Sequence, residues 1–88
     1  MPERPNPLTL RQFEVLRLRS QCLATKDIAA RLGIGTSTAQ SHLRQMRLTL
    51  GTRWDMKAIS IALRQGWLEE EEVESTVLSY IEAKGLLK

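Results

Sequence analysis

The stretch that most limits the fold of this chain is KDIAARLGIGTSTAQSHLRQM, residues 26–46. Before its glycines, apolar residues recur at helical spacing, which predicts a short helix over residues 25–32. Gly33 suits the left-handed backbone conformation that ends a helix. The residues after the glycines predict a longer helix over 36–50, because one narrow stripe of its surface is apolar and comprises Ala39, Leu43, Met46 and Leu50.

Three further helices are expected around this pair. Thr9 has the character of an N-cap for a helix that runs to about Gln21. A fourth helix is expected over about residues 55–65. The acidic run from Glu69 to Glu72 favours a helix start, since carboxylates face the positive end of a helix, and a fifth helix is expected over about residues 71–83. The predicted fold class is all-α: a four-helix bundle with an additional C-terminal helix.

Composition excludes several classes of protein. The chain has 88 residues, enough for one small domain, and its single cysteine cannot form an internal disulfide. One histidine and one cysteine leave too few ligands for a structural zinc site, and no nucleophile–base pair or paired carboxylates are apparent, so no catalytic residue, metal or cofactor is expected. No apolar run approaches the roughly 20 residues of a membrane span. A cytoplasmic location is expected.

Charge divides the chain into unequal parts. Residues 1–67 hold 11 Lys and Arg against 4 Asp and Glu, a net +7, whereas residues 68–88 hold 2 Lys and 6 Glu, a net −4. A basic body with an acidic tail suggests a polyanion as the partner of the body. We therefore expect a flexible arm over residues 1–7, which contain three prolines, a helical domain over residues 8–68, and an acidic helical extension over residues 69–88.

A short helix, a glycine turn and a longer helix with one polar face form a helix-turn-helix pattern. The major groove of DNA admits one α-helix, and its base edges carry a distinguishable code of donors and acceptors. Gln and Arg on the polar face of residues 36–50 are the side chains that pair with adenine and guanine. The pattern therefore indicates double-stranded DNA as the partner.

Four consecutive segments carry a resemblance to a known family: LTLRQFEVLRL, KDIAARLGI, STAQSHLRQM and LGTRWDMKAI. At this succession and spacing the chain resembles the DNA-binding domain of the LuxR/GerE class of bacterial transcription regulators, over roughly Leu8 to Leu68. The resemblance implies a sequence-specific DNA-binding transcription regulator that reads the major groove with the helix over residues 36–50 and acts as a dimer. Only seven residues precede the match, which favours a stand-alone member of the family.

The resemblance also assigns residues to roles. The base-reading positions fall on Gln40, Ser41 and Arg44; because the family usually has Lys or Arg where Gln40 stands, a different base preference is expected. The fourth helix pairs with its mate in the family. The expected phosphate contacts are Thr25, Lys26, Ser37, Thr38 and Arg47, and the expected dimer contacts are Trp54, Ala58, Ile61, Ala62 and Gln65.

Three residues depart from the family pattern. Cys22 stands where glycine is usual, so it must either accept backbone strain or reshape the turn, and we expect a small buried side chain. Asp55 replaces an arginine and is expected to cap the fourth helix. Trp54 is a large apolar residue at a normally polar site, where it either packs against the first helix or contacts a partner.

Two questions stay open at this level. A protein-interaction module is the alternative function, in which the acidic tail or the Trp54 surface binds another transcription regulator or RNA polymerase; a sigma-factor fragment fits the flanking sequence less well. The tail carries an apolar stripe of Val73, Val77, Leu78 and Ile81 on a helix too short to be stable alone. Packing in support of a dimer is the favoured interpretation, ahead of packing on its own domain and of disorder.

Overall fold

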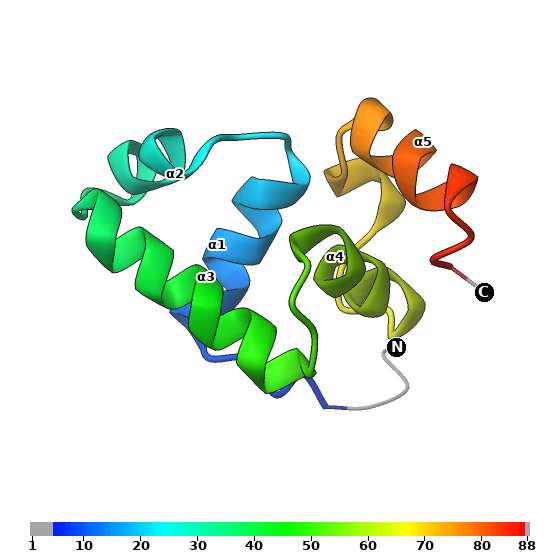
Figure 1. Ribbon diagram of the computed structural model, residues 1–88, viewed down its shortest axis with the longest axis horizontal. Coiled ribbons are helices and arrows are strands. Elements are labelled where there is room, and N and C mark those ends of the chain that lie inside the picture. Colours follow the sequence, from blue (N-terminus) through cyan, green and yellow to red (C-terminus); the bar gives the residue numbers. More distant parts are fainter. Residues whose placement is uncertain (1–4, 88) are drawn as a thin grey trace.

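The computed structural model describes residues 5–87 and contains five α-helices and one 3-10 turn, with no strand in that range. The all-α expectation is confirmed. Figure 1 shows α1 near the centre, with α2 and α3 on one side of it and α4 and α5 on the other. The elements are α1 (Leu10–Ser20), α2 (Thr25–Leu32), α3 (Thr36–Leu50), α4 (Asp55–Arg64), η1 (Glu70–Glu72) and α5 (Ser75–Ala83).

The start of α1 follows directly from the local sequence. The backbone N–H of Gln12 donates to the Thr9 hydroxyl at 3.1 Å, and the Thr9 N–H donates to the Gln12 side chain at 3.2 Å. This reciprocal pair satisfies two backbone donors that the helix cannot bond itself. Within the predicted N-terminal arm, residues 1–4 lie outside the described part of the chain, and residues 5–7 are exposed and have no regular structure.

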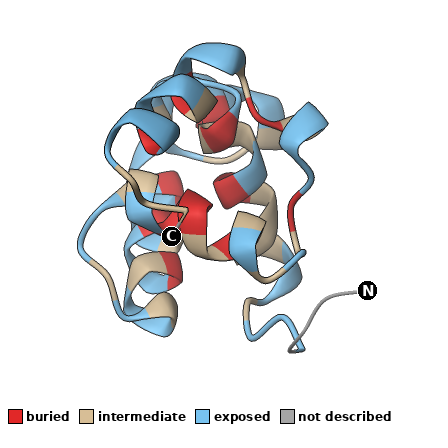
Figure 2. Cartoon of the chain, turned by 90° about the vertical axis from the view of Figure 1, so that its right-hand side faces the viewer, coloured by how far each residue is buried: buried red, intermediate tan, exposed pale blue. Residues whose placement is uncertain are grey.

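The turn between α2 and α3 depends on Gly33. Its φ of +66° lies in the left-handed region, and the N–H of Ile34 donates to the Ala29 carbonyl at 3.0 Å. Glycine adopts this conformation without the steric cost that a Cβ brings. The turn directs α3 so that Ala39, Leu43 and Met46 are buried against α1 and α2, and its polar face is left on the surface (Figure 2).

Helix α4 is buried around most of its circumference. It packs against α1, α3 and α5, and Figure 1 shows it between α3 and α5. Four of its ten residues are buried: Ala58, Ile59, Ser60 and Ala62. The chain therefore covers α4 from both sides.

The acidic run does not begin the last helix, so the expected start at about Glu71 is wrong. Residues Glu70–Glu72 form η1, and the backbone of Val73 is then extended, with φ −97° and ψ 131°. That extension buries the Val73 side chain, which is only 6% exposed. Helix α5 starts afresh at Ser75, because the Glu74 carboxylate accepts a hydrogen bond from the Thr76 N–H at 3.0 Å.

The tail packs on its own domain. Val73, Val77 and Ile81 belong to the same hydrophobic cluster as the buried residues of α1, α3 and α4. Two polar contacts join the tail to α1: Arg17 Nε lies 3.0 Å from Glu72 Oε2, and the Glu74 N–H donates to the Ser20 carbonyl at 2.9 Å. The apolar stripe is therefore not available to a second subunit, and the expectation that it packs in support of a dimer is wrong.

The variant Ile81→Ala tests this packing. Ile81 has no exposed surface, so its truncation should lower the free energy of unfolding by about 2–5 kcal/mol, measured by urea denaturation. The neighbouring Glu82→Ala removes an exposed side chain and should change stability by less than about 0.5 kcal/mol. Equal stabilities of the two variants would contradict a packed α5.

Candidate nucleic-acid interface

The exposed face of α3 gathers most of the predicted DNA contacts. Gln40, Ser41 and Arg44 are exposed, and the buried stripe of the same helix fixes the direction in which they point. They line a polar groove together with Ser37 and with Thr25 from the start of α2. The groove therefore lies along the two helices of the helix-turn-helix, and Arg19 of α1 and Asp55 of α4 also line it.

Two other predicted phosphate contacts lie beside this groove. Lys26 and Thr38 are exposed, in the first turns of α2 and α3, but neither lines the groove. Both helices begin without a side-chain cap, since the N-caps are Ala24 and Gly35. Their first backbone N–H groups therefore remain as donors, and the start of a helix favours an anion.

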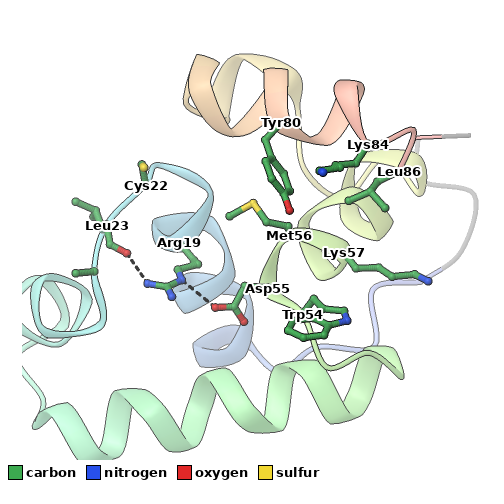
Figure 3. Close-up of a pocket in the computed structure, with 11 residues that line it drawn as sticks. Arg19, Cys22, Leu23, Trp54, Asp55, Met56, Lys57, Tyr80, Lys84 and Leu86 are labelled. Atoms are coloured by element: carbon green, nitrogen blue, oxygen red, sulfur yellow. Dashed lines mark hydrogen bonds and ion pairs between the residues drawn. The ribbon is translucent and has the colours of Figure 1, made fainter.

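One carboxylate connects three helices behind the α3 face. Asp55 Oδ1 lies 2.7 Å from Arg47 on α3, and its Oδ2 lies 2.9 Å from Arg19 Nε on α1. Arg19 also donates to the Leu23 carbonyl at 3.0 Å (Figure 3). The Asp55 side chain is 14% exposed, so both charge-assisted hydrogen bonds are partly shielded from water.

This ion-pair cluster revises two expectations. Asp55 is the first residue of α4, not its cap: the N-cap is Trp54, which makes no side-chain cap bond. The Asp55 carboxylate is engaged by two guanidinium groups and does not serve the helix end. Arg47, an expected phosphate contact, lines the polar groove. One of its guanidinium N–H groups donates a hydrogen bond to Asp55.

The other two departures from the family pattern have different outcomes. Cys22 accepts the strain, with a φ of +68°, and it is exposed, so the expectation of a small buried side chain is wrong. The turn that Cys22 occupies points its side chain outward. Trp54 is 67% exposed and is not packed into the core against α1.

The predicted dimer face is only partly on the surface. Ala58 and Ala62 have no exposed area within the single chain, so their side chains cannot meet a partner subunit, and that part of the prediction is wrong. The physical reason is the burial of α4 between the core and α5. Ile61 and Gln65 are partly exposed and Trp54 is largely exposed, so these three stay at the surface.

Sequence reasoning missed Arg19. It lies 36 positions before its partner Asp55, and no local pattern joins residues at that separation.

The chain is similar in sequence to known proteins. The sequence model described as "Bacterial regulatory proteins, luxR family" matches residues 6–62. The chain belongs to the luxR family. Members of this family are DNA-binding regulators of transcription and not enzymes, so DNA binding in transcription regulation is the function of this domain.

Two relatives from Bacillus subtilis (strain 168) support this assignment. The "Uncharacterized transcriptional regulatory protein YvfU" is 35% identical over 63 residues, which are 72% of this chain and 32% of that protein. The "Spore germination protein GerE" is 37% identical over 62 residues, 70% of this chain and 84% of that protein. This chain thus spans about a third of the first relative and most of the second. No solved structure matches the chain significantly.

Two kinds of feature are absent from residues 5–87: a membrane-spanning helix and a cluster of metal-ligating side chains. No helix there is both long and apolar enough to cross a membrane. No three metal-ligating side chains gather into a possible ion site in the same part of the chain.

The variant Asp55→Asn tests the ion-pair cluster. It keeps the side-chain shape but removes the charge that two partly buried guanidinium groups share, so the free energy of unfolding should fall by about 2 kcal/mol. The exposed control Glu71→Gln should stay within about 0.5 kcal/mol of the parent. In a double-mutant cycle, Asp55→Asn and Arg19→Gln should be non-additive. Additive effects would mean that the pair makes no net contribution.

Proposed function

We propose that the protein binds DNA sequence-specifically, with α3 in the major groove and Gln40, Ser41 and Arg44 against the base edges. The observation that carries this proposal is the arrangement of α3, in which one face is fully buried and these three polar side chains are exposed on the other. Gln matches the donor–acceptor pair of adenine, and Arg matches the two acceptors of guanine.

Phosphate contacts would hold the helix in this position. Thr25 and Lys26 stand at the start of α2, and Ser37 and Thr38 at the start of α3, where the first backbone N–H groups of each helix remain as donors. Of these four residues, Thr25 and Ser37 line the polar groove. Such contacts fix orientation and carry no sequence information themselves. Arg47 would contribute through the N–H groups that Asp55 does not engage.

The position of the acidic tail supports this orientation. Glu72 pairs with Arg17 of α1, and α5 lies on the other side of α4 from α3 (Figure 1). The negative charges of residues 69–82 are therefore held away from the proposed DNA face. A DNA-bound regulator of this kind would act in the cytoplasm.

Base reading and phosphate holding can be separated by mutation. After selection of a preferred duplex from random DNA, Arg44→Ala should cost about 1–3 kcal/mol on that duplex and relax the preference at one base position. Lys26→Ala should weaken binding to all duplexes about equally, because a phosphate contact does not depend on sequence. Fluorescence anisotropy at one stated salt concentration measures both effects.

A matched control removes an arginine on the tail side of the molecule. Arg17→Ala deletes the partner of Glu72 and should change affinity for the selected duplex by less than about threefold, since long-range charge effects are screened. If Arg44→Ala behaves like Arg17→Ala, α3 does not read the bases and the proposal fails.

Dimer formation would double the number of base contacts, because one such domain reads only a short half-site. Of the predicted dimer contacts, Ile61, Gln65 and Trp54 keep surface that a partner could meet. The Oε1 atom of Gln65 is buried and has no hydrogen-bond partner among the described residues. A second subunit that approaches Ile61 would also meet the exposed Lys57 and Arg64 of the same helix.

The variant Ile61→Glu should prevent pairing. A carboxylate at a two-fold contact faces its own copy, so sedimentation equilibrium should show a dimer for the parent chain and a monomer for the variant. Leu10→Glu introduces the same charge at a leucine that is 79% exposed on α1, and it should leave the dimer intact. A dimer that tolerates Ile61→Glu as well as Leu10→Glu would exclude this face.

A protein-interaction module is the second candidate function, and the exposed Trp54 favours it. Its partner would be another regulator or RNA polymerase. The tail gives it less support, since the apolar stripe of α5 is used inside the chain. Failure of any duplex to be enriched from random DNA would favour this candidate.

A further inference from the structure

We propose that a groove between the α1–α2 turn, the first turn of α4 and the last turn of α5 binds a small carboxylic acid with an apolar body. The groove encloses about 830 Å³, which is within the usual range of small-molecule sites. It lies on a different side of the ion-pair cluster from the polar groove of the DNA face. Figure 3 shows side chains from all three segments around it.

Apolar and aromatic side chains line the groove, where they would contact the apolar body of a ligand. Leu23, Met56 and Leu86 are partly exposed aliphatic side chains from the three segments. Two aromatic rings stand at its edges, Trp54 with 67% and Tyr80 with 49% of its surface exposed. In Figure 3 the Tyr80 ring projects from α5 toward Met56. Partly exposed apolar and aromatic surface of this kind is stabilised when a ligand removes it from water.

The charges of the groove select an anion. Arg19, Lys57 and Lys84 line it, against a single carboxylate, Asp55, which already binds Arg19 and Arg47. Among the described residues, neither lysine has a carboxylate within ion-pair distance, and Lys84 lies over the Tyr80 ring at 5.6 Å from its centroid. One carboxylate on an apolar body would match both the cations and the walls.

The composition of the groove also argues against its being one half of a two-fold protein contact. A second copy docked groove to groove would place three cations against three cations, and like charges at such a contact are unfavourable. The family-matched residues 6–62 do not form the groove alone, because Tyr80, Lys84 and Leu86 come from the extension. Cys22, Trp54 and Asp55, the departures from the family pattern, complete it.

The groove shares a wall with the DNA face. Arg19 and Asp55 line both grooves, and Asp55 holds Arg47 of α3. A bound carboxylate would compete with Asp55 for Arg19 and would add negative charge behind the DNA face, so acid binding and DNA binding would oppose each other. This coupling rests on the proposed function, whereas the acid site itself does not.

The test uses the full chain and four acids: phenylacetate, 4-phenylbutyrate, 1-naphthylacetate and decanoate, each with its neutral amide. In ¹⁵N-resolved NMR titrations, at least one acid should saturate with shifts concentrated at Tyr80, Lys84 and the Trp54 indole N–H. It should bind at least about tenfold more tightly than its amide, a difference of about 1.4 kcal/mol. Lys84→Gln should remove much of this preference, and Arg31→Gln, an exposed cation of α2 outside the groove, should not.

Several outcomes would overturn the proposal. No saturable shift with any acid, equal affinity for acid and amide, or shifts that lie elsewhere would each exclude the site. Changes at Tyr80 and Lys84 that follow protein concentration instead of acid concentration would show that a second copy occupies the groove.

The coupling has its own measurement, made at saturating acid. The affinity for the selected duplex should fall about fivefold or more, and that loss should be smaller in Asp55→Asn. An unchanged DNA affinity would refute the coupling, while absence of DNA binding in the acid-free protein would refute the proposed function and leave the acid titration unaffected.

Discussion

The carboxylate of Asp55 is the contact on which the arrangement of the helices most depends. It binds Arg19 of α1 and Arg47 of α3 from the first turn of α4, and all three side chains are less than one-third exposed. Partly buried charges such as these are stabilised when each has a partner. Removal of the carboxylate would leave two guanidinium groups close together, so the cluster favours one orientation of α3 relative to α1 and α4.

This cluster separates two surfaces of opposite character. On one side lies the polar groove of α2 and α3, with the side chains proposed to meet DNA. On the other lies the mostly apolar groove that α5 completes. The acidic tail, folded onto α1 and α4, therefore has two effects: it keeps negative charge away from the proposed DNA face, and it completes a surface with residues that lie beyond the family match over 6–62.

The sequence predicted those features that local forces determine. The bounds of α2 and α3 follow from apolar periodicity and from Gly33, and the start of α1 follows from Thr9 and Gln12. The exposure of Gln40 and Arg44 follows from the same periodicity, because burial of one face of α3 places the other in water. Their roles in base reading stay predictions, derived from the resemblance and from side-chain chemistry.

Features that depend on contacts between residues far apart in the chain could not be predicted from the sequence. Asp55 at the start of a helix has the pattern of a cap, and only the fold reveals the two arginines that engage it. The family resemblance assigned Ala58 and Ala62 to a dimer face, but a helix covered on both sides buries them within their own chain. The acidic run has the pattern of a helix start, yet burial of Val73 requires an extended residue after η1.

The measurement that tests the central claim most directly is an NMR titration of the ¹⁵N-labelled chain with a selected DNA duplex. The account predicts that the largest shifts fall on amides of residues 36–44 and on the first turn of α2, with little change along α5. Shifts concentrated on α5 and around Trp54, with α3 unmoved, would contradict it, because DNA would then meet the side of the molecule that carries the acidic tail.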